Sequence, residues 1–216
     1  MKDIVIFGCG GLGREVLFQL QEQNKISAEY NILGFCDDNA SLHGKSLSDY
    51  PVLGGSEYLL NYDSPLCVVI AVGKPHIRRL IYNKISENKN ICFPTVTAPG
   101  AVCSDRVKIG KGCIIGFFSC MTVDIEIGDF ALISNHCNVG HDAVLGDFVT
   151  LYPAVHVSGN VHIGTECEIG VGSNIIQGLS LGDRTVIGAG AAVVSDIEGD
   201  CTAVGVPARV IRQNRI

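Results

Sequence analysis

One histidine of this sequence has an acidic neighbour inside a turn, a pattern that suits proton transfer. The pair is His141 and Asp142, within the stretch NVGHDAVLGDF. An imidazole titrates near neutral pH, so it can accept a proton from a reacting group. An adjacent carboxylate can orient the ring and stabilise its protonated form. The pair therefore predicts a general base, and the surrounding elements must present the ring to a substrate.

The elements around this pair follow a six-residue repeat. Every sixth residue from Ile109 to Val193, called the anchor of its hexad, is aliphatic or Met. The residue directly after an anchor is often Gly, and the fourth residue after an anchor is small or aliphatic. Such a repeat is the signature of a parallel β-helix, in which three hexads make one triangular coil of about eighteen residues. We expect the aliphatic anchors to point inward, and Gly or polar residues to turn the corners.

The coil length separates His141 from its competitor, His136. Residues eighteen apart should share a column, so Gly159 follows His141 one coil further along the axis. Because Gly has no side chain, it should leave open space over the imidazole and expose a backbone N–H that could stabilise an oxyanion. His136 has Phe118 and Ala154 in its column, which is less open, so the columns favour His141.

The first part of the chain, residues 1–96, has a different pattern, in which short apolar runs alternate with segments of helical spacing. The runs that predict strands are 3–8, 30–38 and 66–73, and the predicted helices are 13–24 and 75–88. Alternating strands and helices indicate a small parallel sheet. The predicted architecture is therefore an α/β, Rossmann-like domain over 1–96, followed by an all-β parallel β-helix with a C-terminal tail over 97–216.

Glycine-rich turns and acidic residues follow the predicted strands of the first domain. Backbone N–H groups of such a turn can approach a phosphate where a helix begins, and a carboxylate after the next strand can bind a ribose hydroxyl. The candidate residues are Gly8, Gly10, Gly11 and Gly13 after the first strand, Asp37 and Asp38 after the second, and Gly73 and Lys74 after the third.

Three interpretations of this glycine loop stay open. It could bind NAD, a smaller nucleotide diphosphate such as a nucleotide-sugar, or no ligand at all. The domain lacks the second mononucleotide-binding half that a dinucleotide site uses. The nucleotide-sugar is therefore favoured over NAD.

Composition excludes several classes of function. The net charge is −6, so no basic surface for nucleic acid is expected. The N-terminus does not resemble a signal peptide and no apolar run reaches the length of a membrane span, which predicts a cytoplasmic protein. The ten Cys include no CxxC pair, so neither a disulfide framework nor a metal site is expected. Cys137 and Cys167 occupy inward-facing positions and are poor candidates for a nucleophile.

Several motifs along the whole chain resemble the NeuD/PglD-type sugar acyltransferases. These motifs are GCGGLG, FCDD, AVGKPHIR, VGHDAVLGDF, SGNVHIG and VGVPAR. The resemblance implies a left-handed β-helix, a homotrimer, and acetyl-CoA in the groove between neighbouring prisms. It also implies that His141 with Asp142 is the general base, that Gly159 and Ala189 contact the acyl-cofactor through their backbones, and that the glycine loop with Asp37 and Asp38 holds the nucleotide-sugar.

Three further positions bear on this resemblance. Leu12 stands in the glycine loop where many relatives carry His, which leaves the sugar unidentified. Thr150 stands where some relatives place a second His near the cofactor, and it is a candidate cofactor contact. Arg209 in the VPAR tail could bind a CoA phosphate, or it could be a solvated surface charge.

These observations predict an acetyl-CoA-dependent N-acetyltransferase acting on a nucleotide-linked amino-sugar, of the UDP-4-amino-sugar type, for a bacterial surface glycan. Two alternatives are kept. The first is O-acetylation of a sialic acid or similar sugar. The second is a non-catalytic β-helical trimer that binds a nucleotide.

Overall fold

The computed structural model describes residues 1–214, which form two compact units. The first unit is Met1–Pro99 and the second begins at Gly100, so the division falls after Pro99 rather than after residue 96. Within the described residues, no helix is long and apolar enough to span a membrane.

The first unit contains the predicted strands and helices and several short elements besides. The predicted elements are β1 (Lys2–Phe7), α1 (Gly11–Ile26), β2 (Tyr30–Cys36), β5 (Leu66–Ile70) and α3 (Pro75–Ile85). The others are a 3-10 turn at Ala40–Leu42, β3 (Ser46–Leu47), β4 (Tyr50–Gly54), α2 (Ser56–Leu60), β6 (Ile91–Cys92) and β7 (Val96–Thr97). These additional elements are mostly two to five residues long, too short for hydrophobic periodicity to reveal.

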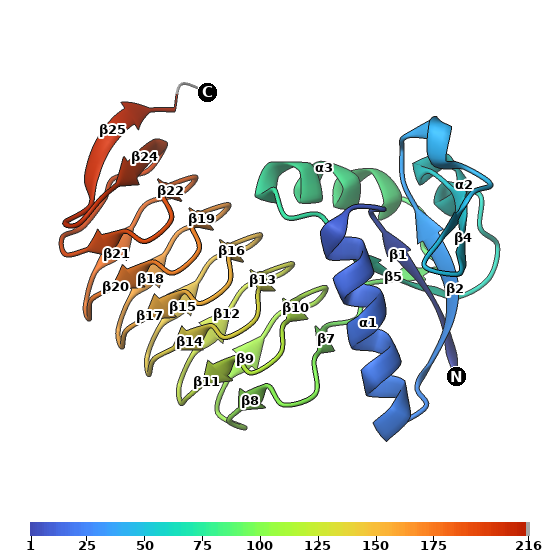
Figure 1. Cartoon of the computed structure of the whole chain (residues 1–216), viewed down its shortest axis with the longest axis horizontal. Coiled ribbons are helices and arrows are strands. Elements are labelled where there is room, and N and C mark those ends of the chain that lie inside the picture. The colour runs from blue at the N-terminus through green and yellow to red at the C-terminus, as the bar shows by residue number, and fades with distance from the viewer. Residues whose placement is uncertain (215–216) are drawn as a thin grey trace. The chain divides into compact units, whose positions relative to one another are not determined.

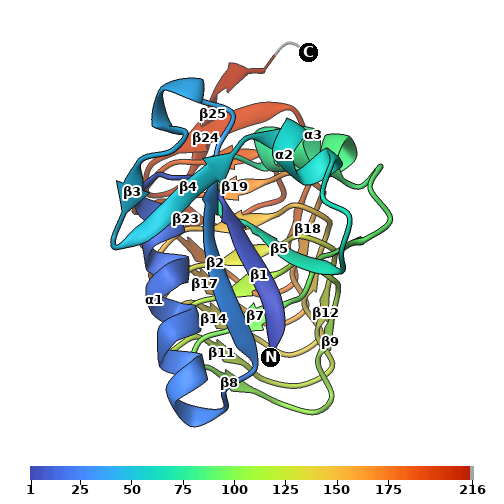
Figure 2. The ribbon, with the colours of Figure 1, turned by 90° about the vertical axis from the view of Figure 1, so that its right-hand side faces the viewer.

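The strand order of the first unit defines where a ligand can bind. The sheet runs β3-β4-β2-β1-β5-β6 and is parallel except for the β3–β4 pair. α1 packs on β1 and β2, and α3 packs on β5 (Figures 1 and 2). From β1 the chain goes to β2 on one side and later returns to β5 on the other. This reversal opens a crevice at the carboxyl ends of β1 and β5, where such sheets bind ligands.

The second unit is a left-handed parallel β-helix whose coils stack along one axis (Figure 1). Its first face contains β10 (Ile114–Ile115), β13 (Leu132–Ile133), β16 (Thr150–Leu151), β19 (Glu168–Ile169), β22 (Val186–Ile187) and β24 (Cys201–Val204), with β25 (Arg209–Gln213) antiparallel beside β24. Its second face contains β8 (Val102–Cys103), β11 (Cys120–Met121), β14 (Asn138–Val139), β17 (His156–Val157), β20 (Asn174–Ile175) and β23 (Ala192–Val193). Its third face contains β9 (Lys108–Ile109), β12 (Glu126–Ile127), β15 (Val144–Leu145), β18 (His162–Ile163) and β21 (Ser180–Leu181).

The register between coils confirms the eighteen-residue period. Ile127 pairs with Leu145, and Val139 pairs with Val157. Of the aliphatic anchors, all but Ile109 are buried, and together with the small residues four places on they form one continuous core. Hydrophobic burial keeps the anchor of each hexad inside the prism. The residues at the turns are therefore directed outward.

The structure corrects the expected role of the glycines that follow the anchors. The corners are turned three places after each anchor, where residues as large as Phe130 and Phe148 adopt positive φ. The glycine directly after the anchor instead allows neighbouring coils to approach. A Cβ on Gly164 would lie 2.6 Å from the backbone nitrogen of Asp183 in the next coil. Stacking, and not turning, is therefore what requires Gly at this position.

Candidate functional site

His141 and Asp142 lie in the turn between β14 and β15, on one edge of the prism. Asp142 occupies the positive-φ position of its hexad, with φ of 58°, which Asp tolerates better than most residues. His141 Nδ1 lies 2.7 Å from Asp142 Oδ2, and the two side chains are 52% and 59% exposed. The imidazole is therefore held by its neighbour and directed away from the core.

Gly159 is the neighbour of this ring, but the space above it is not empty. A Cβ on Gly159 would lie 2.5 Å from His141 Cε1 and would also overlap Nε2. The imidazole thus lies where a side chain of the next coil would otherwise be. The expectation of open space over the ring is corrected, because the missing side chain gives room to the ring itself.

Among the described residues, the Gly159 N–H is one of several at its turn position, with those of Asp147 and Asp183, that donate no hydrogen bond. At the same turn position, the Asp129 and Thr165 N–H groups each donate 2.8 Å hydrogen bonds to a carboxylate one coil further on. The Gly159 N–H therefore leaves a backbone donor available next to the imidazole, which is the arrangement that an oxyanion requires.

Two of the other prism histidines, His136 and His156, have structural partners. His136 adopts φ of 60° and its ring stacks on Phe118 with a centroid distance of 5.3 Å. His156 Nδ1 lies 3.0 Å from Asn138 Nδ2 on the outer surface of the second face. Neither has a carboxylate hydrogen bond like that of His141, so the geometry supports the choice made from the columns.

The predicted cofactor contacts lie at separate places on the prism. Ala189 is exposed in the turn between β22 and β23, whereas Gly159 lies in the turn between β17 and β18, so the two occupy different edges. Thr150, in β16, is 0% exposed. Arg209 is exposed at the start of β25, and its Nη1 donates to the carbonyl of Ala208 at 2.8 Å. One chain therefore does not bring these four residues together.

A groove of about 440 Å³ lies on the third face. The turn that contains His141 connects the second face to this one. The groove is lined by parts of β9, β12 and β15: Lys108, Ile109, Gly110, Glu126, Ile127, Gly128, Val144, Leu145, Gly146 and Asp147. β15, which lines part of this groove, begins three residues after His141. Long clefts with mixed apolar and polar lining are typical of small-molecule sites.

The glycine loop of the first unit has two kinds of glycine. Gly8 (φ 118°) and Gly13 are needed for packing, since a Cβ on Gly8 would lie 2.7 Å from the Ala71 carbonyl oxygen and one on Gly13 would overlap the Gly8 carbonyl oxygen. Gly10 and Gly11, at the start of α1, have nothing within 4 Å of a Cβ position. Gly10 and Gly11 thus leave open space at a helix N-terminus, where a phosphate can bind.

The carboxylates of Asp37 and Asp38 accept hydrogen bonds from different parts of the first unit. Asp37 accepts hydrogen bonds of 2.9 Å from the N–H of Cys9, inside the glycine loop, and from that of Asn39. Asp38 accepts bonds from the N–H and hydroxyl of Ser56, at the start of α2, at 2.6 and 2.9 Å. Asp37 therefore shapes the glycine loop directly, while the carboxylate of Asp38 caps a neighbouring helix.

Arg78 is a residue of this region that the sequence analysis did not single out. It is 1% exposed, and its Nη1 donates to the carbonyls of Val72 and Gly73 at 2.7 and 3.0 Å. These bonds hold the loop that leads to Lys74, the residue before α3. The Arg is part of the quoted AVGKPHIR motif, but its inward direction depends on the helix phase, which the motif alone does not reveal.

The two prism cysteines named in the sequence analysis, Cys137 and Cys167, are buried. In the part of the chain that the structure describes, no group of three or more His, Cys, Asp or Glu could hold a metal ion. Burial raises the pKa of the Cys137 thiol to about 11 and that of Cys167 to about 12. Both thiols are therefore protonated near neutral pH and unsuited to attack.

Comparison with known proteins gives consistent results. A family model described as the PglD N-terminal domain matches residues 3–85. The GDP-perosamine N-acetyltransferase of Escherichia coli O157:H7 is 31% identical, over 97% of this chain and 96% of its own length.

Two solved structures resemble the whole chain. The acetyltransferase domain of PglB from Neisseria gonorrhoeae FA1090 has a TM-score of 0.89 at 30% identity, covering 98% of this chain and 100% of that one. A mutant of perosamine N-acetyltransferase from Caulobacter crescentus, in complex with CoA and GDP-perosamine, has a TM-score of 0.88 at 28% identity and covers 97% of both chains.

Proposed function

The chain belongs to the PglD/NeuD-like family of sugar acyltransferases, and from this premise we propose that it transfers an acetyl group from acetyl-CoA to the amine of a nucleotide-linked amino sugar. The observation that carries the proposal is the exposed imidazole of His141, held at Nδ1 by Asp142 and facing the bare backbone of Gly159. O-acetylation and a non-catalytic nucleotide-binding role are less favoured, because the full-length relative is an N-acetyltransferase.

His141 acts as the general base in this proposal. Asp142 accepts a hydrogen bond from Nδ1–H, which keeps the proton on Nδ1 and leaves the lone pair on Nε2. The sugar amine attacks the thioester carbonyl, and Nε2 removes the amine proton as the new C–N bond forms. Asp142 stabilises the imidazolium that results. The thiolate of CoA then leaves and takes this proton from the imidazolium, which restores the neutral base. Because the amine attacks the thioester directly, no covalent acyl-enzyme is needed.

The backbone of Gly159 supplies the second part of the site. Its N–H is directed from a rigid coil and has no other acceptor among the described residues, so it needs little rearrangement to meet the oxyanion. Preorganised donors of this kind lower the barrier of acyl transfer most effectively. Substitution at Gly159 should therefore affect both the donor and the ring.

We place the nucleotide at the crevice between β1 and β5. Gly10 and Gly11 face the diphosphate there, Asp37 holds the loop, and Gly73 and Lys74 lie at the same edge. We favour a UDP-linked 4-amino sugar, and the relatives named for GDP-perosamine make a GDP-linked sugar the second candidate.

We further propose that acetyl-CoA lies between prisms of a homotrimer. Gly159 and Ala189 are on different edges of one prism, so a ligand in the groove between two prisms would touch one of these backbones on each copy. Self-association would also deepen the shallow groove on the third face.

A substrate panel tests the function directly. Purified protein is incubated with acetyl-CoA and UDP-, GDP- and TDP-linked 4-amino sugars, and thiol release and product mass are measured. The proposal expects CoA release together with a product 42 Da heavier than one amino-sugar substrate. If every amino sugar were inert while a sialic acid hydroxyl were acetylated, the N-acetyltransferase proposal would be wrong.

A further inference from the structure

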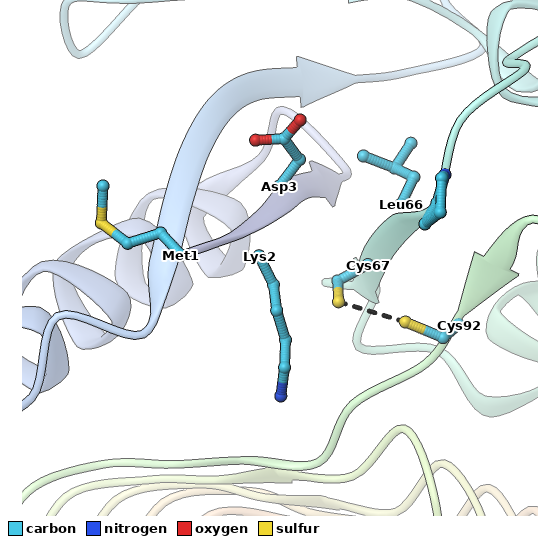
Figure 3. Close-up of a pocket in the computed structure, with 7 residues that line it drawn as sticks. Met1, Lys2, Asp3, Leu66, Cys67 and Cys92 are labelled. Carbon is cyan, nitrogen blue, oxygen red and sulfur yellow. Dashed lines mark hydrogen bonds between the residues drawn. The ribbon is translucent and has the colours of Figure 1, made fainter.

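Two cysteine side chains face each other at the amino end of the first unit's sheet. Cys67 is in β5 and Cys92 is in β6, and the two residues are paired in the strand register. Their sulfur atoms are 3.1 Å apart (Figure 3). This contact lies away from the glycine loop, at the opposite end of β5 from the residues assigned to the nucleotide.

The backbone geometry of this pair suits a disulfide. Residues that are directly paired in adjacent strands point to the same face of the sheet. Neighbouring strands are about 4.8 Å apart, which is within the range of about 4.4–6.8 Å that disulfides span between Cα atoms. Bond formation therefore needs the sulfurs to approach by about 1 Å, which small side-chain rotations can provide.

The pair is open to small reagents from one side. β6 is the edge strand of the sheet, and Cys92 is exposed while Cys67 is 4% exposed. A cavity of about 360 Å³ adjoins both thiols. Its lining consists of Met1, Lys2, Asp3, Pro65, Leu66, Cys67 and Cys92 (Figure 3).

We propose that Cys67 and Cys92 form an oxidative modification site, which hydroperoxides convert reversibly into an intrachain disulfide. The proposal stands on the register, the sulfur separation and the cavity, and it does not depend on the proposed acetyltransferase activity. In a reducing compartment, such bonds serve as transient redox-sensing modifications rather than as permanent cross-links.

The two thiols have different parts in the reaction. Burial raises the pKa of the Cys67 thiol to about 12, a shift that the nearby Lys2 only partly offsets, so Cys67 is a poor first nucleophile. The exposed Cys92 thiolate therefore attacks the peroxide, forming its sulfenic acid and releasing hydroxide. The Cys67 sulfur then displaces the sulfenic hydroxyl, which leaves as water with the Cys67 proton. One dithiol and one hydrogen peroxide thus give one disulfide and two waters.

The bond would fasten the two-residue edge strand β6 to β5. It closes a loop between residues 25 positions apart and so restricts the unfolded chain. We expect the oxidised protein to melt about 5–10 °C higher than the reduced protein.

The test compares reduced and peroxide-treated protein. After treatment with a small molar excess of hydrogen peroxide, free thiols are blocked with N-ethylmaleimide, and intact mass and tryptic peptides are measured. The expected products are a chain about 2 Da lighter before blocking and a peptide with Cys67 joined to the peptide with Cys92, both reversed by dithiothreitol.

Three variants identify the bonded residues. Cys92→Ser and Cys67→Ala should each abolish the cross-link and the rise in Tm. Cys103→Ser is the matched control, because Cys103 is also exposed and lies on the same tryptic peptide as Cys92, but it pairs with Met121 in its register. This control should retain the cross-link.

Either of two results overturns the proposal. One is oxidation of Cys92 to the sulfinic acid while Cys67 remains available to N-ethylmaleimide. The other is a cross-link that persists in Cys92→Ser but vanishes in Cys103→Ser.

Discussion

At the scale of single residues, the candidate site combines the imidazole of His141 with Gly159, which has no side chain. His141 is oriented by Asp142, and its ring lies against the backbone of Gly159. The sequence identifies all three, because coil arithmetic places Gly159 next to His141. It does not reveal that the ring fills the gap left by Gly159, since ring placement depends on how closely two coils approach.

The first prediction concerns the imidazole. His141→Ala should lower kcat for acetyl transfer by roughly 10²-fold or more, because the general base is lost. His136→Ala should have a small effect, since that ring only stacks on Phe118. Steady-state thiol release measures both variants. Near-normal turnover of His141→Ala would exclude His141 from this role.

The second prediction concerns the room that Gly159 leaves for the ring. Gly159→Ala should displace the imidazole and lower kcat by about 10-fold, with little change in Tm, because the ring is the flexible partner. The control is a double-mutant cycle. In the His141→Ala background the same substitution should cost much less, and full additivity would mean that Gly159 acts independently of the ring.

At the scale of elements, the position in the hexad determines the direction of each side chain, and the glycines determine how closely neighbouring coils approach. Anchors face the core, glycines after the anchors permit coil contact, and residues three places on turn the corner. In the first unit, the turns after β1, β2 and β5 meet at one edge of the sheet because the strands are parallel. The sequence predicted these elements, whereas α2, β4 and β6 were too short to recognise.

The third prediction separates stacking from turning. Gly164→Ala places a methyl group against the backbone of the next coil and should lower Tm by roughly 5–10 °C. Gly172→Ala is the matched control. It lies at a corner with φ of 68° and open space, so it should lower Tm by only about 2–4 °C. The Tm values of the two variants are compared by thermal unfolding at one scan rate. A larger loss of Tm in Gly172→Ala than in Gly164→Ala would show that the glycines after the anchors are not required for stacking.

The fourth prediction distinguishes the two aspartates after β2. Asp37→Ala removes the acceptor of the Cys9 N–H and should raise KM for the nucleotide-sugar about 10-fold, while KM for acetyl-CoA is unchanged. Asp38→Ala removes the cap of α2 and should lower Tm by about 2–4 °C without changing KM. A larger KM effect for Asp38→Ala would mean that its carboxylate contacts the substrate.

At the scale of the whole molecule, the cofactor contacts raise the question of assembly. Gly159 and Ala189 lie on different edges of the prism, and Thr150 is buried. A site completed by a neighbouring copy would explain how both edges serve one ligand.

The fifth prediction is complementation between inactive chains. His141→Ala and Ala189→Trp should each be nearly inactive, but differently tagged copies co-expressed in equal amounts should recover activity in about a quarter of all sites. Mixing the separately purified variants without exchange is the control. No recovery after verified co-assembly would show that each chain forms its site alone.

The sequence by itself determined the period of six, the inward anchors and the α/β domain before the repeat, and it led to the prediction of His141 rather than His136 as the base. These features follow from local chemistry, because periodicity, turn residues and neighbouring charges are properties of short segments. The tertiary structure alone decided that Asp38 caps α2, that Arg78 turns inward to hold the loop before Lys74, and that Cys67 meets Cys92. Each of these contacts joins residues through helix phase or strand register, which arise only when the elements pack.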